Sequence, residues 1–227
     1  FINGFPVSLE DVEPTYYLQK GKNKLVCKVN SFDSKTKSKF KVSLQTEGME
    51  PEKVVWEKEV KPNQEMYQYS FTLPNFPWTM PWQDAEEIQE LSKKDRANIK
   101  DIVSQVMGMF KDGDERRFKE VWLANSLSPL AASKIKGKSK EELVKVFFAG
   151  YNALFGPDNR SDIQITRKSD LQVRKSPYNE KVVFVRKTNG GSLIKIESKF
   201  SGVGEADISY ERGYFSLIKL KNKWYVY

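Results

Sequence analysis

Residues 163–227 limit the fold of this chain more than any other stretch, because they read as one antiparallel sheet packed against helices. Short apolar runs alternate with polar residues, and residues 188–191 (Thr-Asn-Gly-Gly) have the composition of a hairpin turn. In residues 193–200 the alternation places Ile194 and Ile196 on one face and charged side chains on the other. One buried and one solvated face are typical of an antiparallel sheet that covers helices.

Helical spacing precedes this sheet. Apolar residues recur at helical intervals from Ile99 to Phe110, and Gly113 follows as a helix end. Shorter helices are predicted at residues 114–123 and 128–137. The sequence therefore predicts an α+β fold in which several helices precede a sheet.

The clearest single helix signal begins at Ser139. Ser139 and Glu142 form a capping box, in which each side chain satisfies a backbone donor of the other residue. The Gly156-Pro157 pair ends this helix. The apolar residues in between predict one buried face made of Leu143, Val146, Phe147, Gly150, Tyr151 and Leu154.

The first part of the chain has a different pattern. No helical period is present before residue 85, and alternating runs at 15–18, 24–29, 39–44, 53–56 and 67–73 are separated by polar turns. Short strands of this kind predict a β-sandwich. Residues 74–84 then carry three prolines and three large aromatic residues, which we expect to form a packed strap, since exposing such rings costs about 2 kcal/mol each. The predicted division is a sandwich domain at 1–75, a linker strap at 76–87 and an α+β domain at 88–227.

Two family resemblances accompany these patterns. The hairpin at residues 1–4 and the Leu-Gln-Lys-Gly-Lys-Asn turn within residues 17–25 resemble jelly-roll β-sandwich modules. Over residues 92–227, the element order, the Lys-Asp-Gly-Asp at 111–114 and the closing strand at 220–226 resemble the nuclear-transport-factor-2-like (NTF2-like, cystatin-like α+β cone) superfamily. This resemblance implies a curved antiparallel sheet over helices. Because members of the superfamily include enzymes, ligand carriers and interaction domains, it does not choose a function.

Composition removes several classes of chemistry. The chain has no histidine, so Ser-His-Asp and Cys-His catalysis are excluded, and with one cysteine it has no internal disulfide. A zinc site without histidine or a second cysteine is not expected, and we predict no metal, no cofactor and no catalytic residue. No apolar run is long enough for a membrane-spanning helix. Since the chain starts at Phe1, inside what reads as a strand, we expect that an upstream segment has been removed.

The resemblance to the cone superfamily supplies a first candidate site. In that superfamily the space between sheet and helices often holds a ligand, and the alternative is a core filled by the same rings. The ring-bearing residues that would line such a pocket are Phe118, Trp122, Phe147, Tyr151 and Trp224.

Charge supplies the second candidate site. Residues 1–85 hold 11 basic and 11 acidic side chains, so the whole net charge of +8 lies in residues 86–227. An uneven charge of this kind directs acidic partners to one part of a protein. The basic-surface candidates are Arg167, Arg174, Lys175, Arg186, Lys187, Lys195 and Lys199.

These observations favour a non-catalytic binding protein of the bacterial envelope or exported fraction, periplasmic or secreted. Its basic second domain would bind an acidic protein surface or an anionic ligand, as an inhibitor or immunity-type factor does. One alternative is an NTF2-like enzyme or carrier with a small apolar ligand in the cone. Another is carbohydrate binding on an exposed shelf of Tyr16, Tyr17 and Trp56. We do not expect nucleic-acid binding. Cones of this type often form homodimers through the sheet.

Overall fold

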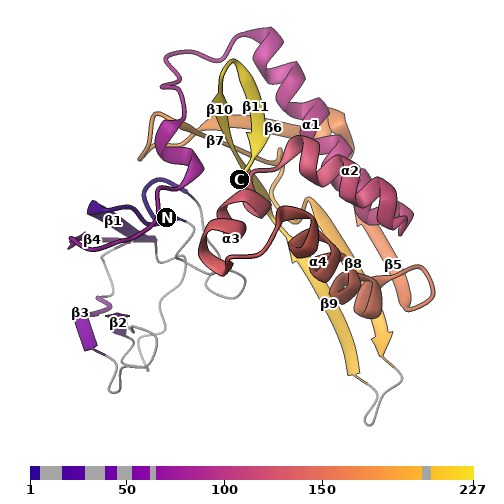
Figure 1. Cartoon of the computed structure of the whole chain (residues 1–227), viewed down its shortest axis with the longest axis horizontal. Helices are drawn as coiled ribbons and strands as arrows, with labels where there is room; N and C mark the ends of the chain where they lie inside the picture. The colour runs from indigo at the N-terminus through magenta and orange to yellow at the C-terminus, as the bar shows by residue number, and fades with distance from the viewer. Residues whose placement is uncertain (6–16, 29–38, 45–52, 62–64, 201–205) are drawn as a thin grey trace.

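The protein has a mixed α+β fold, seen in a computed structural model that describes residues 1–5, 17–28, 39–44, 53–61, 65–200 and 206–227. Helices and strands occupy separate parts of the chain (Figure 1). The helices follow one another before the sheets of the second part of the chain. They are α1 (Lys93–Asp112), α2 (Glu115–Asn125), α3 (Ser128–Lys136) and α4 (Lys140–Phe155).

The strands after α4 form two antiparallel sheets, where the sequence predicted one. A four-stranded sheet has the order β11-β10-β7-β6, and a three-stranded sheet has the order β5-β8-β9. Strand β9 was not predicted, because its charged sequence reads as a connection. The strands are β5 (Arg160–Ile165), β6 (Leu171–Lys175), β7 (Val182–Lys187), β8 (Ile194–Phe200), β9 (Ala206–Arg212), β10 (Tyr214–Leu220) and β11 (Lys223–Val226).

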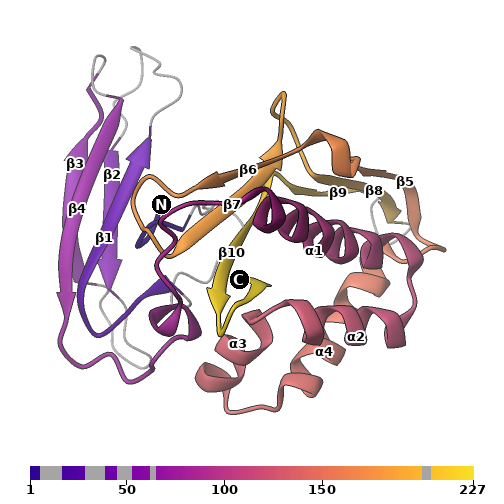
Figure 2. The same ribbon diagram turned by 90° about the horizontal axis from the view of Figure 1, so that it is seen from above.

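The main core lies between these sheets and the helices. Figure 2 shows the sheets on one side and α2, α3 and α4 on the other, with α1 next to the sheets. The apolar face of α1 is buried from Ile99 to Phe110, as its spacing predicted. Ile194 and Ile196 are also fully buried, while Lys195 between them is partly exposed, which confirms the predicted alternation of β8.

The predicted buried face of α4 is confirmed at Tyr151 but is wrong at Val146, Phe147 and Leu154. The structure buries Val144, Phe148, Tyr151 and Phe155, whereas Val146 is 63% exposed and Phe147 is 44% exposed. Apolar residues surround almost the whole helix, so two stripes fit the helical period equally well. The stripe of Val144, Phe148, Tyr151 and Phe155 belongs to the main core, where Phe148 lies 5.2 Å from Phe118 between ring centroids.

The first part of the chain contains two antiparallel strand pairs. Strand β1 (Gly21–Lys28) pairs with β4 (Met66–Leu73), and β2 (Lys39–Leu44) pairs with β3 (Lys53–Glu59). These strands lie at one end of the molecule (Figure 1). Of the predicted run at 15–18, residues 15 and 16 lie outside the described residues, and Tyr17 and Leu18 are not in a strand.

A second core joins the start of the chain to its end. The short helix η2 (Pro81–Asp84) belongs to the proline- and tryptophan-rich segment, and both Met80 and Trp82 are buried. Trp82 packs edge-on against Phe5, and Phe5 lies 5.3 Å from the ring of Tyr227. Val182 and Ile218 from the four-stranded sheet complete this cluster. The segment is therefore packed, as expected from the cost of exposing its rings.

Candidate anion-binding site

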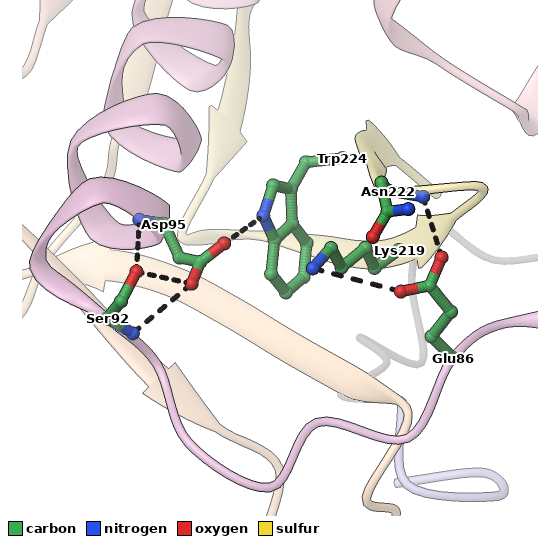
Figure 3. Close-up of polar contacts among 6 residues, drawn as sticks. All are labelled: Glu86, Ser92, Asp95, Lys219, Asn222 and Trp224. Atoms are coloured by element: carbon green, nitrogen blue, oxygen red, sulfur yellow. Dashed lines mark hydrogen bonds and ion pairs between the residues drawn. The ribbon is translucent and has the colours of Figure 1, made fainter.

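The N-terminus of α1 is fixed to the C-terminal hairpin by one carboxylate. Ser92 is the N-cap of α1 and accepts the backbone N–H of Asp95, while Asp95 accepts the backbone N–H and hydroxyl of Ser92. The other carboxylate oxygen of Asp95 accepts the indole N–H of Trp224 at 3.0 Å (Figure 3). Trp224 is 1% exposed, so this hydrogen bond satisfies a buried donor.

A neighbouring contact holds the segment that leads into α1. The Glu86 carboxylate accepts the backbone N–H of Asn222 at 2.7 Å and lies 3.8 Å from the Lys219 ammonium group (Figure 3). The backbone N–H of Glu86 donates to the carbonyl of Lys219. Together with Asp95, these contacts fix the first turns of α1 relative to β10 and β11.

Asp95 is ionised over a wider pH range than a free aspartate. Hydrogen bonds, first from the Ser92 hydroxyl and then from the Trp224 indole, hold the pKa of Asp95 below its ordinary value of 3.8. The carboxylate therefore keeps its role as a cap and as an acceptor down to acidic pH.

A hollow of about 530 Å³ lies beside these first turns. Its walls are Arg96 and Lys100 of α1 and every residue of β6, from Leu171 to Lys175. A volume of this size lies within the range of ligand-binding clefts in proteins. The basic lining comes from two elements that are about 75 residues apart in the sequence: Arg96 and Lys100 from the helix, Arg174 and Lys175 from the strand.

None of these four cations forms an ion pair with a carboxylate in the part of the chain that the structure describes. Instead, the Arg96 guanidinium donates to the carbonyl of Val173 at 2.9 Å, and the Lys175 ammonium donates to the carbonyl of Gln89 at 2.9 Å. The nearby Asp101 is paired with Lys168. The hollow therefore brings four cations together without an ion-pair partner from the described residues.

The structure brings only some of the predicted basic residues to this hollow. Arg174 and Lys175 line it, and Arg186 of β7 adjoins it by donating to Gln172 at 3.3 Å. Lys187 is at the end of β7, opposite Leu171, and Arg167 is exposed at the turn before β6.

The remaining two predicted basic residues belong to the other sheet. Lys195 of β8 is neutralised by Glu197 at 2.8 Å and Glu211 at 3.8 Å. The side chain of Lys199 lies outside the described residues. Sequence reasoning missed Arg96 and Lys100, whose only signal is their helical i, i+4 spacing on the polar side of α1.

Four of the rings predicted to line a pocket, those of Phe118, Trp122, Phe147 and Tyr151, pack against one another. Phe118, Trp122, Tyr151 and Trp224 are buried in the main core, and Phe147 is partly exposed beside Trp122. The Tyr151 hydroxyl donates to the carbonyl of Phe110 at 2.6 Å. Burial of this hydroxyl raises the pKa of Tyr151 to about 12, so it stays protonated at neutral pH.

A second, smaller hollow of about 290 Å³ adjoins the second core. Its polar walls include Asn3, Asn23 and Asn179, which bond to one another or to backbone groups. These bonds satisfy the amides within the protein itself. Of the proposed carbohydrate shelf, Tyr17 is partly buried against Phe5, while Tyr16 and the side chain of Trp56 lie outside the described residues.

Comparison of the chain with protein-family models, curated proteins and solved structures gave no match. Within the described ranges, no helix combines the length and apolar character that crossing a membrane requires. The same residues contain no group of three or more acidic or cysteine side chains placed to hold a metal ion. The chemistry of the basic hollow is therefore the main basis for a functional proposal.

Proposed function

We propose that this protein is a binding protein that holds an acidic partner protein in the hollow between α1 and β6. The observation that carries the proposal is that Arg96, Lys100, Arg174 and Lys175 line one hollow and have no carboxylate partner among the described residues. Unpaired cations around a concave surface attract and orient negative charge. An acidic partner would supply the carboxylates that the chain itself does not place there.

The rest of the molecule fits a role as a rigid support for this surface. We interpret residues 1–75 as a sandwich domain and residues 88–227 as an NTF2-like α+β domain, with the packed segment at 76–87 fixing their orientation. The filled core around Phe118 and Tyr151 favours binding at the outer surface over a ligand inside the cone. An inhibitor or immunity-type factor of the bacterial envelope, or an exported one, would act through such a surface.

The experiment uses fluorescein-labelled hexaglutamate as the probe and hexaglutamine as its uncharged counterpart. The variant K100E/R174E reverses two cations of the hollow that form no described hydrogen bond. The control variant K119E/K145E makes the same change in net charge on exposed positions of α2 and α4. The proposal predicts hexaglutamate binding that weakens in K100E/R174E but not in K119E/K145E, and no binding of hexaglutamine. Equal weakening in both variants would show that net charge alone matters and would refute the site.

A further inference from the structure

Strand β6 is an edge of the four-stranded sheet, and it pairs with β7 on one side only. Figure 2 shows β6 at the outer margin of this sheet. An edge strand offers main-chain donors and acceptors to another extended segment, and proteins recognise peptides by adding them as a further strand.

The register shows which main-chain groups face outward. The Ser176 N–H donates to Val182, and the Thr188 N–H donates to Asp170, so the even-numbered residues of this ladder bond to β7. In an antiparallel pair the alternate residues point their N–H and C=O groups away from the partner strand. The outward groups therefore belong to Leu171, Val173 and Lys175.

Two of these outward groups are already satisfied. The Leu171 N–H donates to Lys168 in the turn that precedes β6, and the Val173 carbonyl accepts from Arg96. The N–H groups of Val173 and Lys175 have no hydrogen-bond acceptor among the described residues. They stand in a row along the wall of the basic hollow.

We propose that the acidic partner docks by adding an extended, acidic segment of about five residues as a new strand on the free edge of β6. This inference rests on the proposed function and specifies the partner's conformation. In the free protein the Arg96 guanidinium covers the Val173 carbonyl, as charged groups commonly protect sheet edges. A carboxylate of the incoming strand binds Arg96 more strongly than a carbonyl does, because both groups are charged. The Val173 carbonyl then becomes available to the new strand.

Charge decides between possible occupants of this edge. A second copy of the chain, paired edge to edge, would bring Arg96, Lys100, Arg174 and Lys175 against the same four cations. Like charges opposite one another destabilise strand pairing. A segment with glutamates at alternate positions places opposite charges there instead.

The test uses the peptide acetyl-Thr-Glu-Val-Glu-Thr-Glu-Val-amide and two N-methylated forms of it. One form carries methyl groups on the glutamate amides, and the other carries them on the threonine and valine amides. N-methylation removes hydrogen-bond donors from one edge of the peptide only, and it leaves charge and side chains unchanged. Strand addition predicts that one form loses about tenfold in affinity and that the other binds like the parent peptide.

A second readout locates the contact. Binding of the parent peptide should slow amide hydrogen exchange at Val173 and Lys175, measured by nuclear magnetic resonance. If both methylated forms bind like the parent, or lose affinity equally, strand addition is refuted. In that case the proposed function still stands, provided that K100E/R174E weakens parent binding and K119E/K145E does not. If the parent peptide does not bind although hexaglutamate does, strand addition alone is refuted, and if neither binds, both proposals are overturned.

Discussion

Asp95 is the residue on which the placement of the candidate site most depends. It caps α1 one residue before Arg96, and it accepts the indole N–H of the buried Trp224. Replacing Asp95 with alanine removes both contacts. Loss of the capping-box contact costs on the order of 1 kcal/mol, and a buried donor without a partner costs about 1–3 kcal/mol. We therefore expect Asp95→Ala to lower the free energy of unfolding by about 2–4 kcal/mol, measured by urea denaturation.

The helix α4 provides a matched control. Glu142 occupies the same capping-box position after Ser139, but it has no contact with an indole. Glu142→Ala should therefore cost only the capping contribution, on the order of 1 kcal/mol. A double-mutant cycle of Asp95→Ala with Trp224→Phe isolates the second contribution, with an expected coupling of about 1–2 kcal/mol. Equal losses at Asp95 and Glu142, with no coupling to Trp224, would refute this account of the helix anchor.

The contribution of Asp95 to the free energy of unfolding should depend on pH in one direction. Because folding lowers the pKa of Asp95 from its ordinary value of 3.8, through the Ser92 hydroxyl and the Trp224 indole, its contribution to stability is complete above pH 3.8. The contribution is lost as the pH falls through the lower, folded value. The difference in unfolding free energy between wild type and Asp95→Asn should therefore shrink as the pH falls through this acidic window.

Four further substitutions test the packing of α4 and the end of α1. Val144→Ala should lower the free energy of unfolding by about 2 kcal/mol, while Val146→Ala on the exposed side of α4 should change it by less than about 0.5 kcal/mol. A larger loss in Val146→Ala than in Val144→Ala would support the buried face predicted from sequence. Tyr151→Phe should lower the free energy of unfolding by about 1 kcal/mol, because the hydrogen bond to Phe110 is lost. It should also remove the absorbance change near pH 12 that we assign to ionisation of Tyr151, and an unchanged absorbance step in the variant would assign that pKa to another tyrosine. Gly113→Ala should cost about 1–2 kcal/mol in thermal unfolding, because Gly113 has φ +65° and a Cβ there would lie 2.5 Å from Pro157; an unchanged melting temperature would contradict this reason.

Local signals predicted local structure well. The Ser139 capping box, the Gly113 helix end and the alternation around Ile194 all depend on neighbouring residues, and the structure contains each of them. The buried face of α4 could not be predicted, since residues on two adjacent stripes are apolar. Only tertiary packing of the helix into the main core decides which stripe is buried.

The candidate site was predictable only in part, for a similar reason. Arg174 and Lys175 stand out as adjacent cations at the end of a predicted strand, but only tertiary packing brings Arg96 and Lys100 to them. Lys195 shows the opposite error. Its closer partner Glu197 lies two residues further along the same strand, and its second partner Glu211 belongs to β9, which was not predicted. A charge on a strand cannot be assigned to a site until its acidic neighbours on the same strand and on the adjacent strand are known.

The most direct test of the central claim is a residue-by-residue map of where an acidic peptide binds. Amide chemical shifts of the isotope-labelled protein would be followed while the threonine-glutamate-valine peptide is added at low salt, and again at about 0.5 M salt, where surface charges are strongly screened. We predict that the shifted amides cluster at residues 96–100 and 171–175 and that the effect fades at high salt. Shifts centred on another part of the molecule, or shifts that salt does not weaken, would contradict the assignment of the basic hollow as the binding site.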